Sequence, residues 1–107
     1  MSENPFQPGQ RNMEVMEALE EGPDKVADAL LEWRKASLIR ERKEAMLYLQ
    51  FKSAEGKRTA GEIEAMVDAD DERYTLRLQE AMKESEYHRF LEKLLAAKKM
   101  ADLRTAF

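Results

Sequence analysis

The sequence predicts an all-α protein: a long antiparallel helical hairpin with a short N-terminal helix and a short helix at its elbow. Charged residues make up 37% of the 107 residues, well above the usual quarter. Glycine and proline are scarce, with only 4 and 3 of each. Residues 24–55 and 72–103, about 30 residues each, contain neither breaker and are rich in good helix formers. We therefore expect two long helices to dominate the fold.

The domain organisation is simple. Residues 1–12 hold two of the three prolines and no periodic apolar pattern, so we expect a flexible N-terminal tail there. Residues 13–107 are long enough for a single helical domain and too short for two separate cores. No apolar run approaches the ~18–20 residues that cross a bilayer, so no membrane partner is expected.

The first expected element is a short helix over residues 13–21. Asn12 is a suitable N-cap, and apolar residues recur behind it at helical spacing. We expect Gly22 and Pro23 to end this helix, because proline lacks the amide hydrogen that a helix interior needs. Pro23 suits the first turn of the next helix instead.

The first long helix is expected from Asp24 to about residue 54, with Gly56 as the left-handed residue behind its end. The segment Thr59 to Glu62 matches a capping box and predicts a short helix over residues 60–69. Acidic residues then suit the start of the last helix, over residues 72–103. Because the connection is short, the two long helices should run antiparallel.

Each long helix carries two apolar faces. On the first, a seam repeats every seven residues at Leu31, Leu38 and Ala45, with Leu49 beside it. The second face contains Val26, Leu30, Trp33, Leu47, Tyr48 and Phe51, and is interrupted by Arg40 and Glu44. The last helix has one face with Tyr74, Leu78, Ala81, Ser85, His88 and Leu95, and another with Leu76, Tyr87, Leu91, Leu94 and Ala101.

One hairpin cannot bury two faces on each arm, and exposed apolar stripes favour association. We therefore expect a homo-oligomer, with an interface that draws on Leu31, Leu38, Leu49, Leu76, Tyr87, Leu91 and Leu94. The alternative is a monomer in which the two short helices cover the second stripe.

The sequence has few of the residue combinations that are typical of catalytic sites, so the chain is not expected to be an enzyme. There is no cysteine, and the single histidine, His88, lies one turn from Glu84 and Glu92, as in a solvated ion-pair row. The acidic residues around Asp70 lack the spacing of a calcium loop and favour helix capping over a metal site. No catalytic residue, cofactor or metal is therefore assigned.

The net charge of −4 conceals an uneven distribution. Residues 1–32 carry 2 basic and 8 acidic side chains, residues 33–61 carry 8 and 3, and residues 62–107 carry 8 and 11. A basic segment interleaved with aromatic residues is typical of single-strand nucleic-acid binding, although an ordinary charged helix face is the alternative. The candidate binding residues are Trp33, Arg34, Lys35, Arg40, Arg42, Lys43, Lys52, Lys57 and Arg58.

The order of these features resembles a known family. It comprises Trp33-Arg34-Lys35 before a basic helix, the turn Ser53-Ala54-Glu55-Gly56-Lys57-Arg58, the acidic step Val67-Asp68-Ala69-Asp70-Asp71, and the ending from Lys99 to Phe107. Over residues 30–107 this pattern is similar to the UvsY family, the small all-helical recombination mediators of T-even-type bacteriophages. The resemblance implies an oligomeric protein that acts in the cytoplasm of a bacterial host. Such a protein would bind single-stranded DNA, displace a single-strand-binding protein and help to load a RecA-like recombinase.

Two other classes of function remain open from the sequence. One is a phage-encoded inhibitor that binds a host protein through its acidic faces. The other is a structural or assembly-chaperone protein without a role in nucleic-acid binding.

Overall fold

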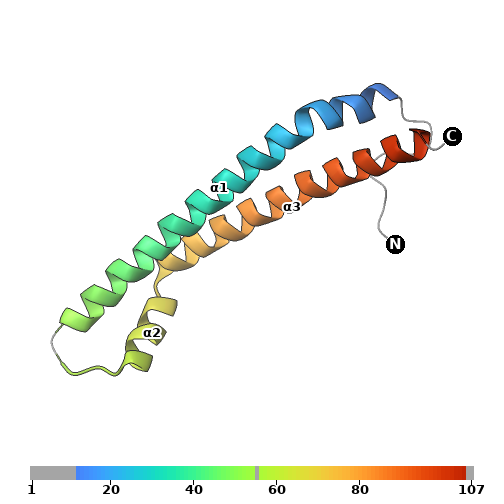
Figure 1. The fold of residues 1–107 in the computed structure, drawn as a ribbon. Helices are drawn as coiled ribbons and strands as arrows, with labels where there is room; N and C mark the ends of the chain where they lie inside the picture. Colours follow the sequence, from blue (N-terminus) through green and yellow to red (C-terminus); the bar gives the residue numbers. More distant parts are fainter. Residues whose placement is uncertain (1–11, 55, 106–107) are drawn as a thin grey trace. The chain divides into compact units, whose positions relative to one another are not determined.

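The computed structural model describes residues 12–54 and 56–105, and over these residues it contains three α-helices (Figure 1). They are α1 (Asn12–Ser53), α2 (Ala60–Asp68) and α3 (Asp71–Thr105). The all-α class is confirmed, as is the hairpin of two long antiparallel helices with a short helix at its elbow. Apart from Asn12, which begins α1, the tail predicted for residues 1–12 lies outside the described residues.

The chain forms two compact units. Of the described residues, 12–31 and 84–105 make up one of them, and 32–54 and 56–83 make up the other. In the first unit, the beginning of α1 packs against the end of α3. Val15 and Ala97 are buried at the centre of this contact, and the side chains around them are Ala18, Leu19, Ala96 and Met100.

Helix α1 continues without a break through Gly22 and Pro23, so the prediction of a separate helix over residues 13–21 is wrong. Proline inside a helix removes one hydrogen bond and costs roughly 3 kcal/mol. However, apolar side chains before and after it, Val15 and Ala29, are both buried within the same unit. Since a break would disturb the burial of both segments, apolar burial outweighs the local penalty.

Gly22 contributes to the same contact by its lack of a side chain. A Cβ atom at this position would lie 2.8 Å from Cδ1 of Leu94, closer than real contacts allow. Leu94 is only 6% exposed. This leucine, assigned from the sequence to an interface between copies, therefore fills space inside one chain.

In the second unit, local signals define the elbow as predicted. Gly56 has a φ of 104°, a left-handed conformation that glycine adopts without steric strain. Thr59 is the N-cap of α2, and its Oγ1 accepts a hydrogen bond from the amide of Glu62 at 3.2 Å. Asp70 caps α3 in the same way, because its Oδ1 accepts from the amide of Arg73 at 2.9 Å.

Helix α2 packs on the end of α1 through a small apolar core. Ile63 and Val67 are buried against Leu47, and Tyr48 and Phe51 pack around them. This arrangement explains why nine residues suffice for α2. Its apolar residues recur four apart, so they share one face of the helix, and that face meets α1.

The two predicted apolar faces of each long helix have different environments. On α1, the face interrupted by Arg40 points inward. The heptad seam is on the surface, where Leu38 is 64% exposed and Leu49 is 66% exposed. On α3, Leu76, Tyr87 and Leu91 are half-buried, whereas Tyr74, Leu78 and Met82 are exposed. Of the residues assigned to an interface between copies, Leu31, Leu38 and Leu49 therefore remain on the surface.

None of the helices in the described part of the chain is both long and apolar enough to span a membrane.

The continuity of α1 predicts the effect of replacing Pro23. The substitution Pro23→Ala restores a helix hydrogen bond and removes a steric clash, a gain of about 3 kcal/mol that greater freedom of the unfolded chain partly offsets. We expect the free energy of unfolding, measured by urea denaturation followed by circular dichroism, to rise by about 2 kcal/mol. An unchanged stability would indicate that the helix ends at Pro23 in solution.

Candidate nucleic-acid interface

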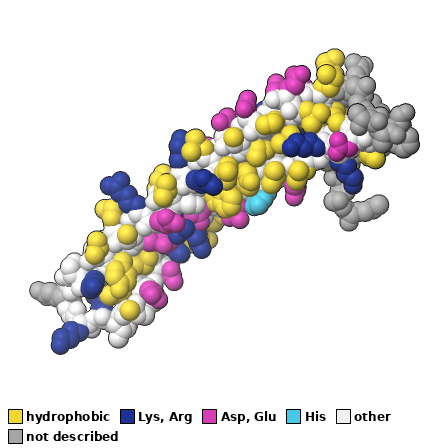
Figure 2. Space-filling view, viewed as in Figure 1, with side chains coloured by type: hydrophobic (Ala, Val, Ile, Leu, Met, Phe, Trp, Pro, Cys, Tyr) yellow, Lys and Arg dark blue, Asp and Glu magenta, His cyan; other side chains and the backbone are white. Residues whose placement is uncertain are grey.

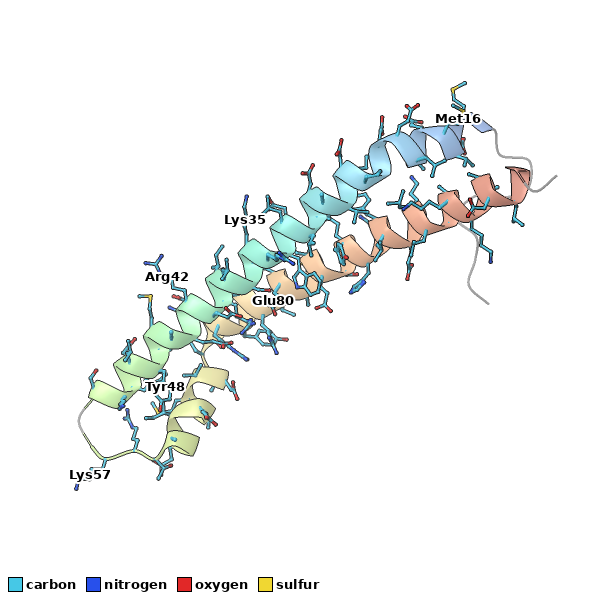
Figure 3. The ribbon with its side chains drawn as sticks, in the orientation of Figure 1. Met16, Lys35, Arg42, Tyr48, Lys57 and Glu80 are labelled. Atoms are coloured by element: carbon cyan, nitrogen blue, oxygen red, sulfur yellow. The ribbon has the colours of Figure 1, made fainter. Side chains whose placement is uncertain are left out.

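The exposed cations of the basic segment lie on α1 and on the loop of residues 56–59 before α2. They are Arg34, Lys35, Arg42, Lys52, Lys57 and Arg58. Figure 3 shows Lys35 and Arg42 extending from the side of α1 that faces away from α3, and Lys57 extending from the loop. Among the described residues, no carboxylate lies within ion-pair distance of Arg42. We call these six residues the outer cations.

The outer cations are available to a ligand to different degrees. Lys35 lies 3.4 Å from the Glu32 carboxylate, but both side chains are more than half exposed, so this pair is weak. Arg58 donates a hydrogen bond to the carbonyl oxygen of Phe51 at 3.2 Å, which ties the loop to the end of α1. Lys and Arg side chains are visible at this end of the unit in Figure 2.

Arg40 is placed quite differently from the outer cations. Its side chain is 15% exposed and points toward α3, where its Nε donates to Oε2 of Glu80 at 2.7 Å. Its Nη1 also donates to the Glu44 carboxylate at 3.0 Å. The guanidinium of Arg40 therefore joins two helices, and it is not presented to a phosphate on the surface.

This contact is part of a larger cluster, which we call the central ion cluster. Arg73 donates to Glu44 at 3.0 Å and approaches Asp68 at 3.5 Å, while Arg77 donates to Glu80 at 3.1 Å. The Glu80 side chain is 10% exposed, the deepest charge among the described residues. In Figure 3 its label marks the place where α1 and α3 meet.

Sequence reasoning did not find the central ion cluster. The available signal was the interruption of the inward face of α1 by Arg40 and Glu44. A matching signal lies on α3, where Arg73 and Glu80 are two turns apart on the same face as Leu76. Charges of opposite sign within two apolar faces are consistent with pairing between those faces.

Lys43 is also engaged across the two helices. Its Nζ pairs with the carboxylate of Glu72, and its side chain is 28% exposed. The hydrogen bond that Lys43 donates to the Glu72 carboxylate raises the pKa of Lys43 above its usual value. Lys43 is therefore a weaker candidate for a phosphate contact than the outer cations.

The pKa values of the cluster carboxylates reflect competing effects. Burial alone would raise the pKa of Glu80, but hydrogen bonds from Arg40 and Ser37 and the positive charges of Arg40 and Arg77 lower it below its usual value. Burial would likewise raise the pKa of Glu44, and Arg40 and Arg73 lower it. Both groups therefore remain charged in the folded chain at neutral pH.

The aromatic residues of the basic segment do not share a face with the outer cations. Trp33, Tyr48 and Phe51 are half-buried. Tyr48 and Phe51 pack against the core formed by Leu47 and α2. The apolar residues that do accompany Lys35 and Arg42 on the outer side are aliphatic, and include Leu38 and Leu49.

A shallow cavity of about 190 Å³ lies between α1 and α2. It is lined by Glu44, Tyr48, Glu64, Val67 and Asp68. Three carboxylates in its wall make it unfavourable for a phosphate. A polyanion is therefore expected on the outer side of α1 rather than in this cavity.

Within residues 12–54 and 56–105, no three His, Asp or Glu side chains are grouped closely enough to hold a metal ion.

Comparison of the chain with protein-family models, with curated proteins and with solved structures finds no match.

Removal of Glu80 tests the central ion cluster. The variant Glu80→Ala removes the partner on α3 of the partly buried Arg40 guanidinium, so we expect the free energy of unfolding to fall by about 3 kcal/mol. The matched control is Glu41→Ala, because Glu41 also approaches Arg40, at 3.7 Å, but is 59% exposed. This control should lose less than about 1 kcal/mol. If urea denaturation gave equal losses of unfolding free energy for Glu80→Ala and Glu41→Ala, a stabilising role of the buried Glu80 would be contradicted.

The lowered pKa values predict acid destabilisation. The unfolded chain binds protons at Glu44 and Glu80 at a higher pH than the folded chain, so stability falls as the pH drops below about 4.3 toward the lower folded pKa values. Urea denaturation at a series of pH values measures how steeply the free energy of unfolding changes with pH. We expect the stability of Glu80→Gln to depend less steeply on pH than the stability of the wild-type chain does. If the free energy of unfolding of Glu80→Gln changed with pH as steeply as that of the wild-type chain, the lowered pKa of Glu80 would be contradicted.

Proposed function

We propose that this chain is a non-enzymatic accessory protein that binds single-stranded DNA along the outer cations. The supporting observation is the segregation of charge in residues 32–83. Lys35 and Arg42 extend outward from α1, while the cavity beside α2 collects Glu44, Glu64 and Asp68. A polyanion that follows the outer side of α1 therefore meets cations and avoids the acidic wall.

The chemistry of this face favours a single strand over a duplex. Lys35 and Arg42 are separated by two helical turns, about 10 Å along α1. Exposed aliphatic side chains lie among these cations and offer apolar contact to bases. Single-strand binders of this kind combine a basic track with apolar or aromatic contacts and have little sequence preference.

One copy of the chain would bind weakly, because the whole chain has a net charge of −4. Several copies on one strand would raise the overall affinity without new contacts, since each bound copy increases the local concentration of the next site. Self-association is therefore part of this proposal. The exposed apolar side chains of α3 support it, among them Tyr74, Leu78 and Met82.

The resemblance to the UvsY family extends the proposal to recombination. A chain of that kind would act in the cytoplasm of a phage-infected bacterium. It would remodel a single-strand-binding protein and assist the loading of a RecA-like recombinase. The extension rests on the order of sequence features alone.

Fluorescence anisotropy of a labelled oligothymidylate tests DNA binding. We expect the logarithm of affinity to fall linearly with the logarithm of salt concentration, by about 0.7 per phosphate contact. The triple variant Lys35→Glu, Arg42→Glu and Lys52→Glu should lower the slope by about 2, because it removes three contacts.

A matched control carries the same change of charge on α3. Lys93, Lys98 and Lys99 are exposed, and replacing all three with glutamate should alter binding much less than the α1 variant does. An equal effect of both variants would show that only total charge matters and would contradict the proposed face. No binding at low salt would favour a host-protein inhibitor or a structural role.

A further inference from the structure

Lys43 lies at the border of the outer side of α1. It directly follows Arg42 in the sequence, and at helical spacing its neighbours include Ile39 and Met46, which are both exposed. The side chain of Lys43 is 28% exposed, whereas that of Arg40 is 15% exposed. The ammonium group of Lys43 is therefore more accessible to a ligand than the guanidinium of Arg40, although both are engaged with carboxylates of α3.

The ion pair of Lys43 is easier to exchange than the ion pair of Arg40. Nζ of Lys43 pairs with Oε2 of Glu72, whose side chain is 77% exposed. An ion pair with so exposed a member is weak, because water screens it and solvates the carboxylate when the pair opens. Glu80 is instead 10% exposed and would remain largely shielded from water if Arg40 moved away. An anion that approaches α1 can therefore displace Glu72 but not Glu80.

We propose that Glu72 competes with the nucleic acid for Lys43. In the free chain Glu72 holds the ammonium group, and in the complex a phosphate of the bound strand takes its place. Lys43 keeps an anionic partner in both states, while water solvates the displaced carboxylate. Glu72 thus lowers the affinity of the chain for a polyanion, and Lys43 adds one phosphate contact to those of the outer cations.

Helix geometry brings Lys43 within reach of a strand that follows the outer cations. Consecutive residues are about 1.5 Å apart along the helix axis and about 100° apart around it, so Lys43 lies beside Arg42. Lysine has a flexible stem and no fixed donor geometry, so its ammonium group can turn from Glu72 to a phosphate without a movement of α1. Arg40 lacks this freedom, because Glu44 and Glu80 both accept hydrogen bonds from its guanidinium.

This inference rests on the proposed binding of single-stranded DNA and adds an internal regulation of that site. The ion pair itself is measurable without DNA, and the competition is measurable only with DNA. Absence of DNA binding by the wild-type chain would contradict the proposed function. Binding of DNA in which Lys43 and Glu72 have no coupled effect would contradict the competition alone, so the two failures are distinguishable.

Fluorescence anisotropy of a labelled oligothymidylate measures the effect of Glu72. We expect Glu72→Gln to raise the affinity about threefold, because a phosphate no longer has to displace a carboxylate. The matched control is Asp71→Asn, since Asp71 is exposed in the same first turn of α3 but does not pair with Lys43. Its gain should stay below about 1.5-fold, because salt screens a charge that makes no direct contact. Equal gains from two variants that circular dichroism shows to be helical would overturn the competition.

A double-mutant cycle shows whether the gain depends on Lys43. The variant Lys43→Gln should lower the dependence of log affinity on log salt by about 0.7, as expected for the loss of one phosphate contact. In a chain that carries Lys43→Gln, the further change Glu72→Gln should raise the affinity no more than Asp71→Asn does. An undiminished gain from Glu72→Gln, or a Lys43→Gln chain with the wild-type salt dependence, would overturn the proposal.

Nuclear magnetic resonance of lysines that carry isotopically labelled methyl groups tests the ion pair in the absence of DNA. The pKa of Lys43 should be lower in Glu72→Gln than in the wild-type chain, because the hydrogen bond to Glu72 raises it. The control Asp71→Asn should change this pKa less. An equal pKa of Lys43 in the wild-type chain and in Glu72→Gln would show that the pair does not form in solution, and would overturn the proposal.

Discussion

The ion pair between Arg40 and Glu80 determines how α1 and α3 meet in residues 32–83. A shift of α3 by one residue would rotate Glu80 by about 100° around the helix axis and out of reach of Arg40. Two partly buried charges would then each lose a partner on the other helix, which costs more than the rearrangement of a few aliphatic contacts. The polar cluster therefore fixes the register of the two helices, while the apolar residues around it contribute most of the burial.

The same cluster divides the cations of the basic segment into two groups. Arg40 and Lys43 point toward α3 and are engaged with Glu80 and Glu72. Lys35 and Arg42 lie within two turns of Arg40 but on the opposite side of α1, which faces away from α3. Because a helix turns by about 100° per residue, neighbouring cations in the sequence have opposite roles. The proposed DNA-binding face is therefore smaller and more one-sided than the basic segment itself.

Within residues 32–83, the two outer faces that remain are chemically different. The α1 face combines aliphatic residues with Lys35 and Arg42, and suits a polyanion. The outer side of α3 in the same residues carries Thr75, Leu78 and Met82, which are exposed and uncharged. Both faces are exposed for one reason, namely that each long helix uses its single inward face against its antiparallel neighbour.

Features that depend on nearby residues followed from the sequence. Gly56, Thr59 and Asp70 act within four residues of their own positions, so the elbow and both caps were predictable. The helical class followed from composition, because long breaker-free segments of good helix formers have few alternatives. The presence of two apolar faces on each long helix also followed, since helical periodicity alone determines which residues share a face.

The tertiary structure decided what depends on residues far apart in the chain. Pro23 has a strong local tendency to end a helix, but burial of Val15 and Ala29 on both sides of it carries α1 through. Arg40 looks like any other cation of the basic segment until α3 places Glu80 beside it, 40 residues away. The sequence thus determined the helices and their faces by local stereochemistry. Which face is inward, and which charges are engaged, was decided by the requirement that buried charges find partners on another helix.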